Sequence, residues 1–189
     1  MLSSQKARVA RSRRNRKRRD LLDRCLYYRG RGRFEELESR LVLSANPFYS
    51  ADSATSGVDL TLRVQEDRLR LFDASETEVA SATLAEITEL VRIVGSQHDD
   101  AFHFDISTSL ATANLSAAIL FEGGVGSDTV FGPDSVSFWT VTGDQTGNLG
   151  GSDVLQFTST ENLTGGAADD SFNFTEAGSL SGVIDGGLG

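Results

Sequence analysis

The chain has 189 residues, enough for one modest domain, and its charges are unevenly distributed. Residues 1–45 contain 14 of the 18 Lys and Arg residues but 5 of the 27 Asp and Glu residues, a net charge of +9, whereas the rest of the chain has a net charge of −18. This acidity argues against nucleic acid as a partner, because phosphates would be repelled. The single cysteine, Cys25, excludes an internal disulfide framework, and no apolar run is long enough for a transmembrane segment.

Residues 1–33 form a basic arm, which we predict to be disordered or to contain at most a short helix, because its charges repel one another. Residues 34–45 have helical spacing, with Phe34, Leu37 and Leu41 on one face. Residues 46–56 are small, polar and contain a proline, which predicts a linker.

From residue 57 onward the period changes to that of β-strands. The stretch VDLTLRV alternates apolar and polar residues, RLRLFD does the same, and the short QED between them predicts a hairpin or two successive strands. Residues 77–95 have mixed signals, and we interpret them as mostly strand because the sequence after residue 95 is rich in strand patterns.

A loose repeat begins near residue 91, in which a Gly-rich turn and an aspartate precede alternating apolar residues. Its spacing suits one supersecondary unit per repeat, stacked on its neighbour. We therefore predict an all-β fold, specifically a right-handed parallel β-solenoid of the β-helix or β-roll type over residues 57–189, with Phe102/Phe104 and Phe172/Phe174 in its core. The repeat aspartates are Asp100, Asp128, Asp153 and Asp170.

Two copies of the repeat are candidate Ca²⁺ sites. GGVGSDTVF at 123–131 fits the calcium-binding nonapeptide G-G-x-G-x-D-x-U-x in full, and GGAADDSFN at 165–173 fits except at Ala168. Calcium rolls, however, need tandem copies about nine residues apart, so structural Gly-Asp turns without metal are the alternative. The candidate ligands are Gly123, Gly124, Gly126, Asp128, Gly165, Gly166, Asp169 and Asp170.

Other chemistry has weaker support. His98 and His103 have no cysteine partner and no third histidine, so we interpret them as surface residues. The acidic pairs Asp99/Asp100 and Asp169/Asp170 could serve a hydrolase, but they fall at predicted turns rather than on a strand face. No cofactor other than Ca²⁺ is suggested.

The stretch FEELESRLVLSA at 34–45 resembles the LEPR-XLL motif, with matches at Leu37, Glu38, Arg40 and Leu43, and with Ser39 where the family has proline. In that family the motif stands at the N-terminus of long, repeat-rich, exported proteins, and the repeats here resemble their haemolysin-type regions. The resemblance implies that 34–45 is a targeting motif read by export machinery, and that the protein is extracellular or on the cell surface.

Together these features predict the N-terminal portion of a non-enzymatic, structural or adhesive exported protein, which binds an unidentified surface or matrix partner and for which Ca²⁺ is the candidate stabilising ion. One alternative is a non-catalytic N-terminal region of a large extracellular hydrolase. Another is a nucleic-acid or membrane binder that acts through the basic arm. The last residues, VIDGGLG, open a further repeat copy without its aspartate, so we also expect the reading frame to continue past Gly189.

Overall fold

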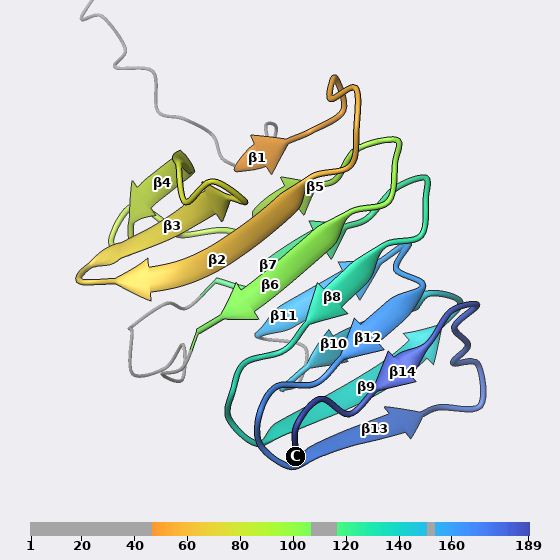
Figure 1. Cartoon of the computed structure of the whole chain (residues 1–189). Helices are drawn as coiled ribbons and strands as arrows, with labels where there is room; N and C mark the ends of the chain where they lie inside the picture. Colours follow the sequence, from red (N-terminus) through yellow and green to blue (C-terminus); the bar gives the residue numbers. More distant parts are fainter. Residues whose placement is uncertain (1–46, 107–116, 151–153) are drawn as a thin grey trace, which may run out of the picture. The chain divides into compact units, whose positions relative to one another are not determined.

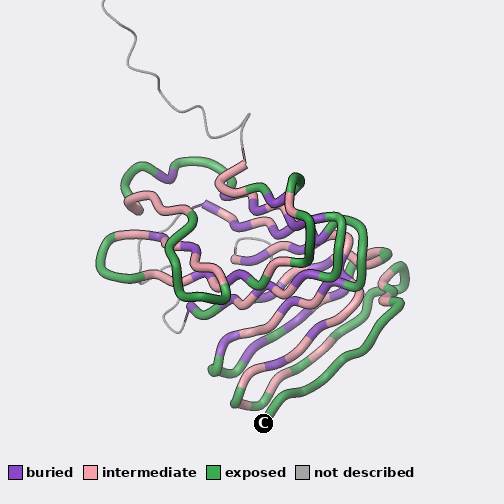
Figure 2. Tube along the Cα trace, turned by 45° about the horizontal axis from the view of Figure 1, so that its top comes forward, coloured by how far each residue is buried: buried purple, intermediate pink, exposed green. Residues whose placement is uncertain are grey.

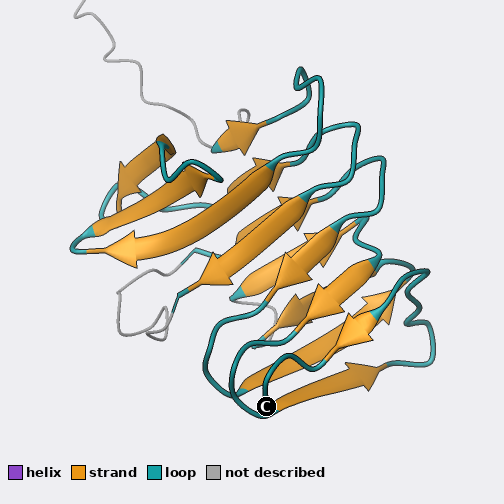
Figure 3. Cartoon of the chain, in the orientation of Figure 1, coloured by secondary structure: helices purple, strands orange, loops and turns teal. Residues whose placement is uncertain are grey.

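The computed structural model describes residues 47–106, 117–150 and 154–189. The chain divides into two units, Met1–Leu41 and Val42–Gly189, and every described residue belongs to the second. Within these ranges the secondary structure consists of 14 β-strands and includes no helix (Figure 3). The described part of the chain is therefore all-β.

The strands form two seven-stranded sheets that lie face to face (Figure 1). In spatial order the first sheet contains β1 (Tyr49–Ser50), β5 (Val91–Val94), β7 (Ile119–Glu122), β11 (Leu155–Thr158), β10 (Thr146–Leu149), β9 (Ser137–Gly143) and β13 (Asp170–Phe174). The second contains β14 (Ile184–Asp185), β12 (Asn162–Thr164), β8 (Thr129–Phe131), β6 (Ala101–Asp105), β2 (Asp59–Gln65), β3 (Arg68–Asp73) and β4 (Glu78–Thr83).

The basic structural unit is a β-arch, in which the chain leaves a strand of the first sheet, turns, and enters a strand of the second sheet. The described arches are β1–β2, β5–β6, β7–β8, β11–β12 and β13–β14. Successive arches stack through parallel pairs, such as β5 with β7 and β6 with β8. We call the turns from the first sheet to the second forward turns, and those from the second to the first return turns.

The prediction of a right-handed parallel β-solenoid is wrong, because both sheets mix parallel and antiparallel pairs. At one end of the second sheet β2, β3 and β4 form an antiparallel meander, and in the first sheet β9, β10 and β11 form another. Both meanders contain a two-residue reversal, in which Glu66 and Gln145 take positive φ values of 57° and 50°. Period-two alternation is the same in both pairing modes, so the sequence pattern does not distinguish them.

Several local predictions are confirmed. The stretch from 58 to 73 forms the hairpin of β2 and β3, and residues 77–95 contain the two strands β4 and β5.

Residues 46–56, predicted to be a linker, include β1, which pairs with β5, and Ala51, which is buried. The folded region therefore begins earlier than position 57.

Buried positions recur along the strands of both sheets (Figure 2), and the core that they form lies between the sheets in rows of residues at matching register. In the second sheet Leu60, Phe102, Val130 and Leu163 lie in one such row and are at most 1% exposed. Phe102 stacks on Phe121 of the first sheet, with ring centroids 4.6 Å apart, which ties the two layers together.

The prediction for the two phenylalanine pairs holds for only one of them. Phe102 and Phe104 are buried, whereas Phe172 is half-buried and Phe174 is 47% exposed. Phe172 stacks on the buried Trp139 at 5.6 Å, so it still contacts the core. Phe172 and Phe174 lie on β13, an edge strand, and this end of the sandwich is open on one side.

Candidate functional site

The structure places the two predicted calcium-binding groups in different turns. Gly123, Gly124, Gly126 and Asp128 lie in the forward turn between β7 and β8, whereas residues 165–170 lie in the return turn between β12 and β13. Forward turns follow the carboxyl ends of the parallel strands in the first sheet, and return turns precede them, so the two groups lie at opposite edges of the sandwich (Figure 1). They do not form one site.

The forward turns are joined by a column of three acidic side chains, one each from the arches β5–β6, β7–β8 and β11–β12. Asp100 Oδ1 accepts the backbone N–H of Val58 at 2.8 Å, Asp128 Oδ1 accepts that of Asp100 at 2.8 Å, and Glu161 Oε2 accepts that of Asp128 at 2.7 Å. Each acceptor thus bonds the N–H at the equivalent position of the preceding arch. The column fastens one arch to the next by charge-assisted hydrogen bonds.

Glycine recurs five residues before the aspartate because the carboxylate occupies the space of a side chain. A β-carbon at Gly123 would lie 2.5 Å from Asp128 Oδ2, and one at Gly95 or Gly165 would collide with the Oδ2 of Asp100 or Asp170. A carbonyl of the next arch closes the same space from the other side. The Gly-Asp spacing is therefore explained by packing within the turn.

Asp128 is the least satisfied member of the column. It is fully buried, and its Oδ2 has no hydrogen-bond partner in the described part of the chain. Asp100 differs because Ser96, four residues earlier, donates both its N–H at 2.5 Å and its hydroxyl at 2.7 Å, whereas Gly124 holds that position before Asp128 and has no hydroxyl.

This environment changes the acidity of Asp128. Burial raises the pKa of its carboxyl from about 3.8 to about 6, and the nearby charges of Asp100, Glu161 and Asp99 act in the same direction. The hydrogen bond from the Asp100 N–H opposes the shift but does not cancel it. Asp128 therefore titrates near pH 6 rather than near pH 3.8.

The return turns repeat the same device at the opposite edge. Asp170 Oδ1 accepts the Ser137 N–H at 3.0 Å and its hydroxyl, while Asp170 Oδ2 accepts the Gly166 N–H at 2.8 Å. Asp134 Oδ1 accepts the Ala167 N–H at 3.1 Å. The carboxylate of Asp170 thus joins the start of the neighbouring strand β9 to its own turn, and Asp100 likewise joins the start of β2 to its turn at the other edge.

Sequence reasoning missed Glu161 and Asn162, which continue the forward column without a Gly-Asp motif. The Asn162 side chain donates to the Ser127 hydroxyl at 3.0 Å, and its Oδ1 accepts the Val183 N–H at 2.9 Å. Glu161 lies directly before the strand NLT and Asn162 is the first residue of that strand, so they occupy the positions of Asp128 and Thr129. This position relative to the strand is the signal by which the sequence could have indicated them. Asp153, another of the repeat aspartates, lies outside the described residues.

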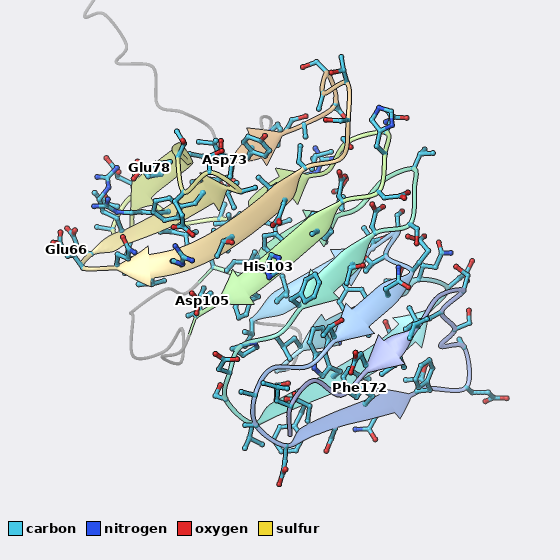
Figure 4. All side chains as sticks on the ribbon, in the orientation of Figure 1. Glu66, Asp73, Glu78, His103, Asp105 and Phe172 are labelled. Carbon is cyan, nitrogen blue, oxygen red and sulfur yellow. The ribbon has the colours of Figure 1, made fainter. Side chains whose placement is uncertain are left out.

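The two histidines have separate surroundings. His103 on β6 stacks on Phe131 with centroids 4.2 Å apart, and its Nε2 lies 3.2 Å from Asp59 Oδ1 (Figure 4). His98 lies in the forward turn, where its backbone N–H donates to the Ser96 hydroxyl. The structure does not bring these imidazoles together into one cluster.

Among the described residues, no group of three or more His, Cys, Asp and Glu side chains is arranged to hold a metal ion. Nor do these residues contain a helix with the length and hydropathy needed to cross a membrane. The targeting-motif residues Leu37, Glu38, Arg40 and Leu43 lie outside the described part of the chain.

Comparison with known proteins gave no relatives: no family model matches the chain, and neither does any curated protein or solved structure. The resemblance to the LEPR-XLL motif, and the export that it implies, therefore stay predictions. Evidence on the function of this chain comes instead from the geometry of its turns.

Proposed function

We propose that this chain is a structural and adhesive, non-enzymatic part of an exported or cell-surface protein, and that the acids of its Gly-Asp turns fasten neighbouring arches. The supporting observation is the use of the carboxylates: Asp100 and Asp170 each accept three hydrogen bonds, which come from their own turn and from the neighbouring strand or turn in the stack. A carboxylate engaged in this way serves cohesion between arches.

The same observation bears on the alternative of polysaccharide hydrolysis. Hydrolysis by paired carboxylates needs two acids that face a sugar from the two sides of a bond. Here Asp100 is buried and bonded within its turn, and Asp99 Oδ1 accepts the Ser127 N–H at 2.8 Å. These two acids therefore point to different arches, which favours the structural role.

Calcium dependence tests the proposal directly. A calcium ion bound at a hundred times its Kd would stabilise the fold by roughly 2.7 kcal/mol. We expect instead that the melting temperature of the full chain at neutral pH is the same in millimolar calcium and in EDTA. A melting temperature several degrees higher in calcium would show that metal ions, rather than carboxylate–amide bonds alone, hold the turns.

An Asp170→Ala variant supplies the matched control. It removes the acceptor for the Ser137 and Gly166 amides, so it should lower the melting temperature by the same amount in both buffers. A loss seen only in the presence of calcium would identify Asp170 as a metal ligand.

A further inference from the structure

Four neighbouring strands of the first sheet, β9, β10, β11 and β13, present an outward side that carries no charge (Figure 1). Their inward residues face the core, and every outward residue of these strands is Thr, Ser, Asn, Gln or Phe. We call this surface the neutral face. It differs from the rest of the region, because residues 46–189 contain 22 acidic and 4 basic side chains.

Charged side chains lie on other surfaces of the sandwich. On the outward side of the second sheet, Arg63 of β2 bonds Asp105 of β6, which is labelled in Figure 4. Within the first sheet the neutral face ends at β7, where Glu122 accepts two hydrogen bonds from Arg92 of β5. The lack of charge is therefore a property of these four strands and not of the whole region.

A row of unused hydrogen-bonding groups crosses the neutral face. Asn148 of β10, Thr140 of β9 and Asn173 of β13 are partners in register, so their side chains lie in line across three strands. Within the described part of the chain none of these three side chains makes a hydrogen bond, whereas the Asn162 side chain of the second sheet both donates and accepts. The three groups are therefore available to a ligand.

An exposed aromatic ring lies beside this row. Phe138 precedes Thr140 by two residues on β9, so it is on the same side of the sheet, and it is 60% exposed. The face of an aromatic ring is electron-rich and attracts polarised C–H groups. A sugar ring has polarised C–H groups on its faces and hydroxyls around its edge, so an exposed aromatic ring beside amide and hydroxyl groups matches it.

We propose that the neutral face binds an extended, uncharged polysaccharide. One sugar ring packs on Phe138, and hydroxyls of this sugar and of the next bond Asn148, Thr140 and Asn173, whose amide and hydroxyl groups both donate and accept. Because strands lie about 4.8 Å apart, Asn148 and Asn173 are roughly 10 Å apart, a span longer than one sugar ring. The proposal rests on the adhesive function proposed above and names the class of its partner.

Charge favours an uncharged polysaccharide over other partners. A polyuronate, a sulfated glycan or a nucleic acid would bring negative charge to a region with a net charge of −18, which repels it. A protein partner would need an apolar centre with several anchoring side chains, whereas Phe138 is surrounded by polar residues on this face. An uncharged glycan matches the face in charge and in hydrogen-bonding groups.

The neutral face does not depend on where the sequence ends. Phe138, Thr140 and Asn148 lie on β9 and β10, which are already paired on both sides. A further strand paired with β13 would extend the first sheet in its own plane, so it would lengthen the neutral face without covering it.

The test is isothermal titration of the full chain with the β-1,4-linked hexasaccharides of glucose, mannose and xylose, which are extended and uncharged. We expect saturable binding of at least one of them. Binding should weaken about tenfold in Phe138→Leu, which keeps an apolar side chain but removes the ring face. Polygalacturonate, a negatively charged polymer, should bind at least tenfold more weakly than that hexasaccharide.

Two threonine variants separate the neutral face from the fold. Thr140→Ala removes a hydroxyl from the row and should weaken binding about fivefold. Thr61→Ala makes the same change on the outward side of β2, in the second sheet, and should leave binding unchanged. Both threonines are half-buried, and neither side chain makes a hydrogen bond within the described residues, so the two variants should melt alike.

Three results would overturn the proposal. The first is that none of the hexasaccharides binds at millimolar concentration. The second is that Phe138→Leu and Thr140→Ala bind as tightly as the unaltered chain, and the third is that polygalacturonate binds equally well. Failure of the proposed function would be seen differently, because release of new reducing ends from a bound hexasaccharide would show hydrolysis while the binding face remained.

Discussion

Asp128 shows how one residue can set the pH response of the whole fold. Its folded pKa of about 6 is higher than its ordinary value of about 3.8, so the folded state binds a proton more tightly than the unfolded state does. Well below pH 3.8 the Asp128 carboxyl is neutral in both the folded and the unfolded state, so folding buries no charge at this residue. As pH rises from there through 6, the folded protein must accommodate a buried charge, and stability falls.

We therefore predict that the free energy of unfolding decreases between about pH 4.5 and pH 7.5, by about 2 kcal/mol, since most of the interval between the two pKa values lies in this range. Urea denaturation at the two pH values measures this change. An Asp128→Asn variant should be more stable than the unaltered chain at the higher pH, by about 2 kcal/mol, and should show little pH dependence in this range.

An exposed carboxylate provides the comparison. Asp67 lies in the turn between β2 and β3 and is exposed, so Asp67→Asn should leave the pH dependence as it is. If the unaltered chain were equally stable at both pH values, Asp128 could not be the buried charge described above.

At the scale of the element, the return turns offer the same glycine in two environments. Gly165 is closed in by the Asp170 carboxylate and by the Gly186 carbonyl, whereas Gly186 is open. Gly165→Ala should therefore lower the free energy of unfolding by about 1–3 kcal/mol, as overpacking does. Gly186→Ala should change it by less than about 0.5 kcal/mol, as surface substitutions do.

Both alanine variants can be compared by thermal and urea unfolding of the purified full chain. Equal stabilities would mean that the Gly165 turn relaxes around a methyl group, and that packing against the carboxylate is not the reason for glycine there.

The elements also show what could be predicted from sequence. The hairpin of β2 and β3 was predictable because strict alternation and a short polar turn are local signals. Gly and Asp marked turns correctly for a similar reason, since the carboxylate folds back on its own turn. The division of these turns into forward and return groups depends on which sheet each strand joins, and that is a tertiary property.

The meander of β9, β10 and β11 illustrates the same limit. Its residues alternate as parallel strands do, and the reversal at Asp144 and Gln145 has neither Asn-Gly nor Asp-Gly, the usual hairpin signals. Glu161 was missed because a glutamate without a preceding glycine does not resemble the motif, although its longer side chain reaches the Asp128 amide. The antiparallel pairing of β9, β10 and β11 and the acids outside the Gly-Asp motif were therefore not predictable from the sequence pattern.

For the described region as a whole, the two ends of the sandwich differ. At one end the second sheet extends through β3 and β4, and Leu69 and Leu71 of β3 are fully buried. At the other end lie the edge strands β13 and β14, where Phe174 and Ile184 are 47% and 38% exposed. We predict that amide hydrogen exchange is slow in β2, β3 and β6 and fast in β13 and β14, because local opening follows the density of buried contacts.

Exchange measured by mass spectrometry or NMR at constant pH tests this gradient. Uniform protection from β2 to β14 would contradict the prediction, because it would mean that β13 and β14 open no more readily than the strands of the meander.

The antiparallel meander of β2, β3 and β4 has a further consequence, for the order of folding. Its strands follow one another in the chain, so little loop entropy is lost when they pair. The pairing of β2 with β6 costs more entropy, because β3, β4 and β5 lie between these two strands in the sequence. The meander is thus the natural nucleus, on which β6, β8 and β12 can add in turn. Substitutions in Leu62 or Leu71 should then slow folding, while those in Leu163 should mainly speed unfolding. We therefore expect this sandwich to assemble from the meander toward β12, in the same order in which the ribosome synthesises these strands.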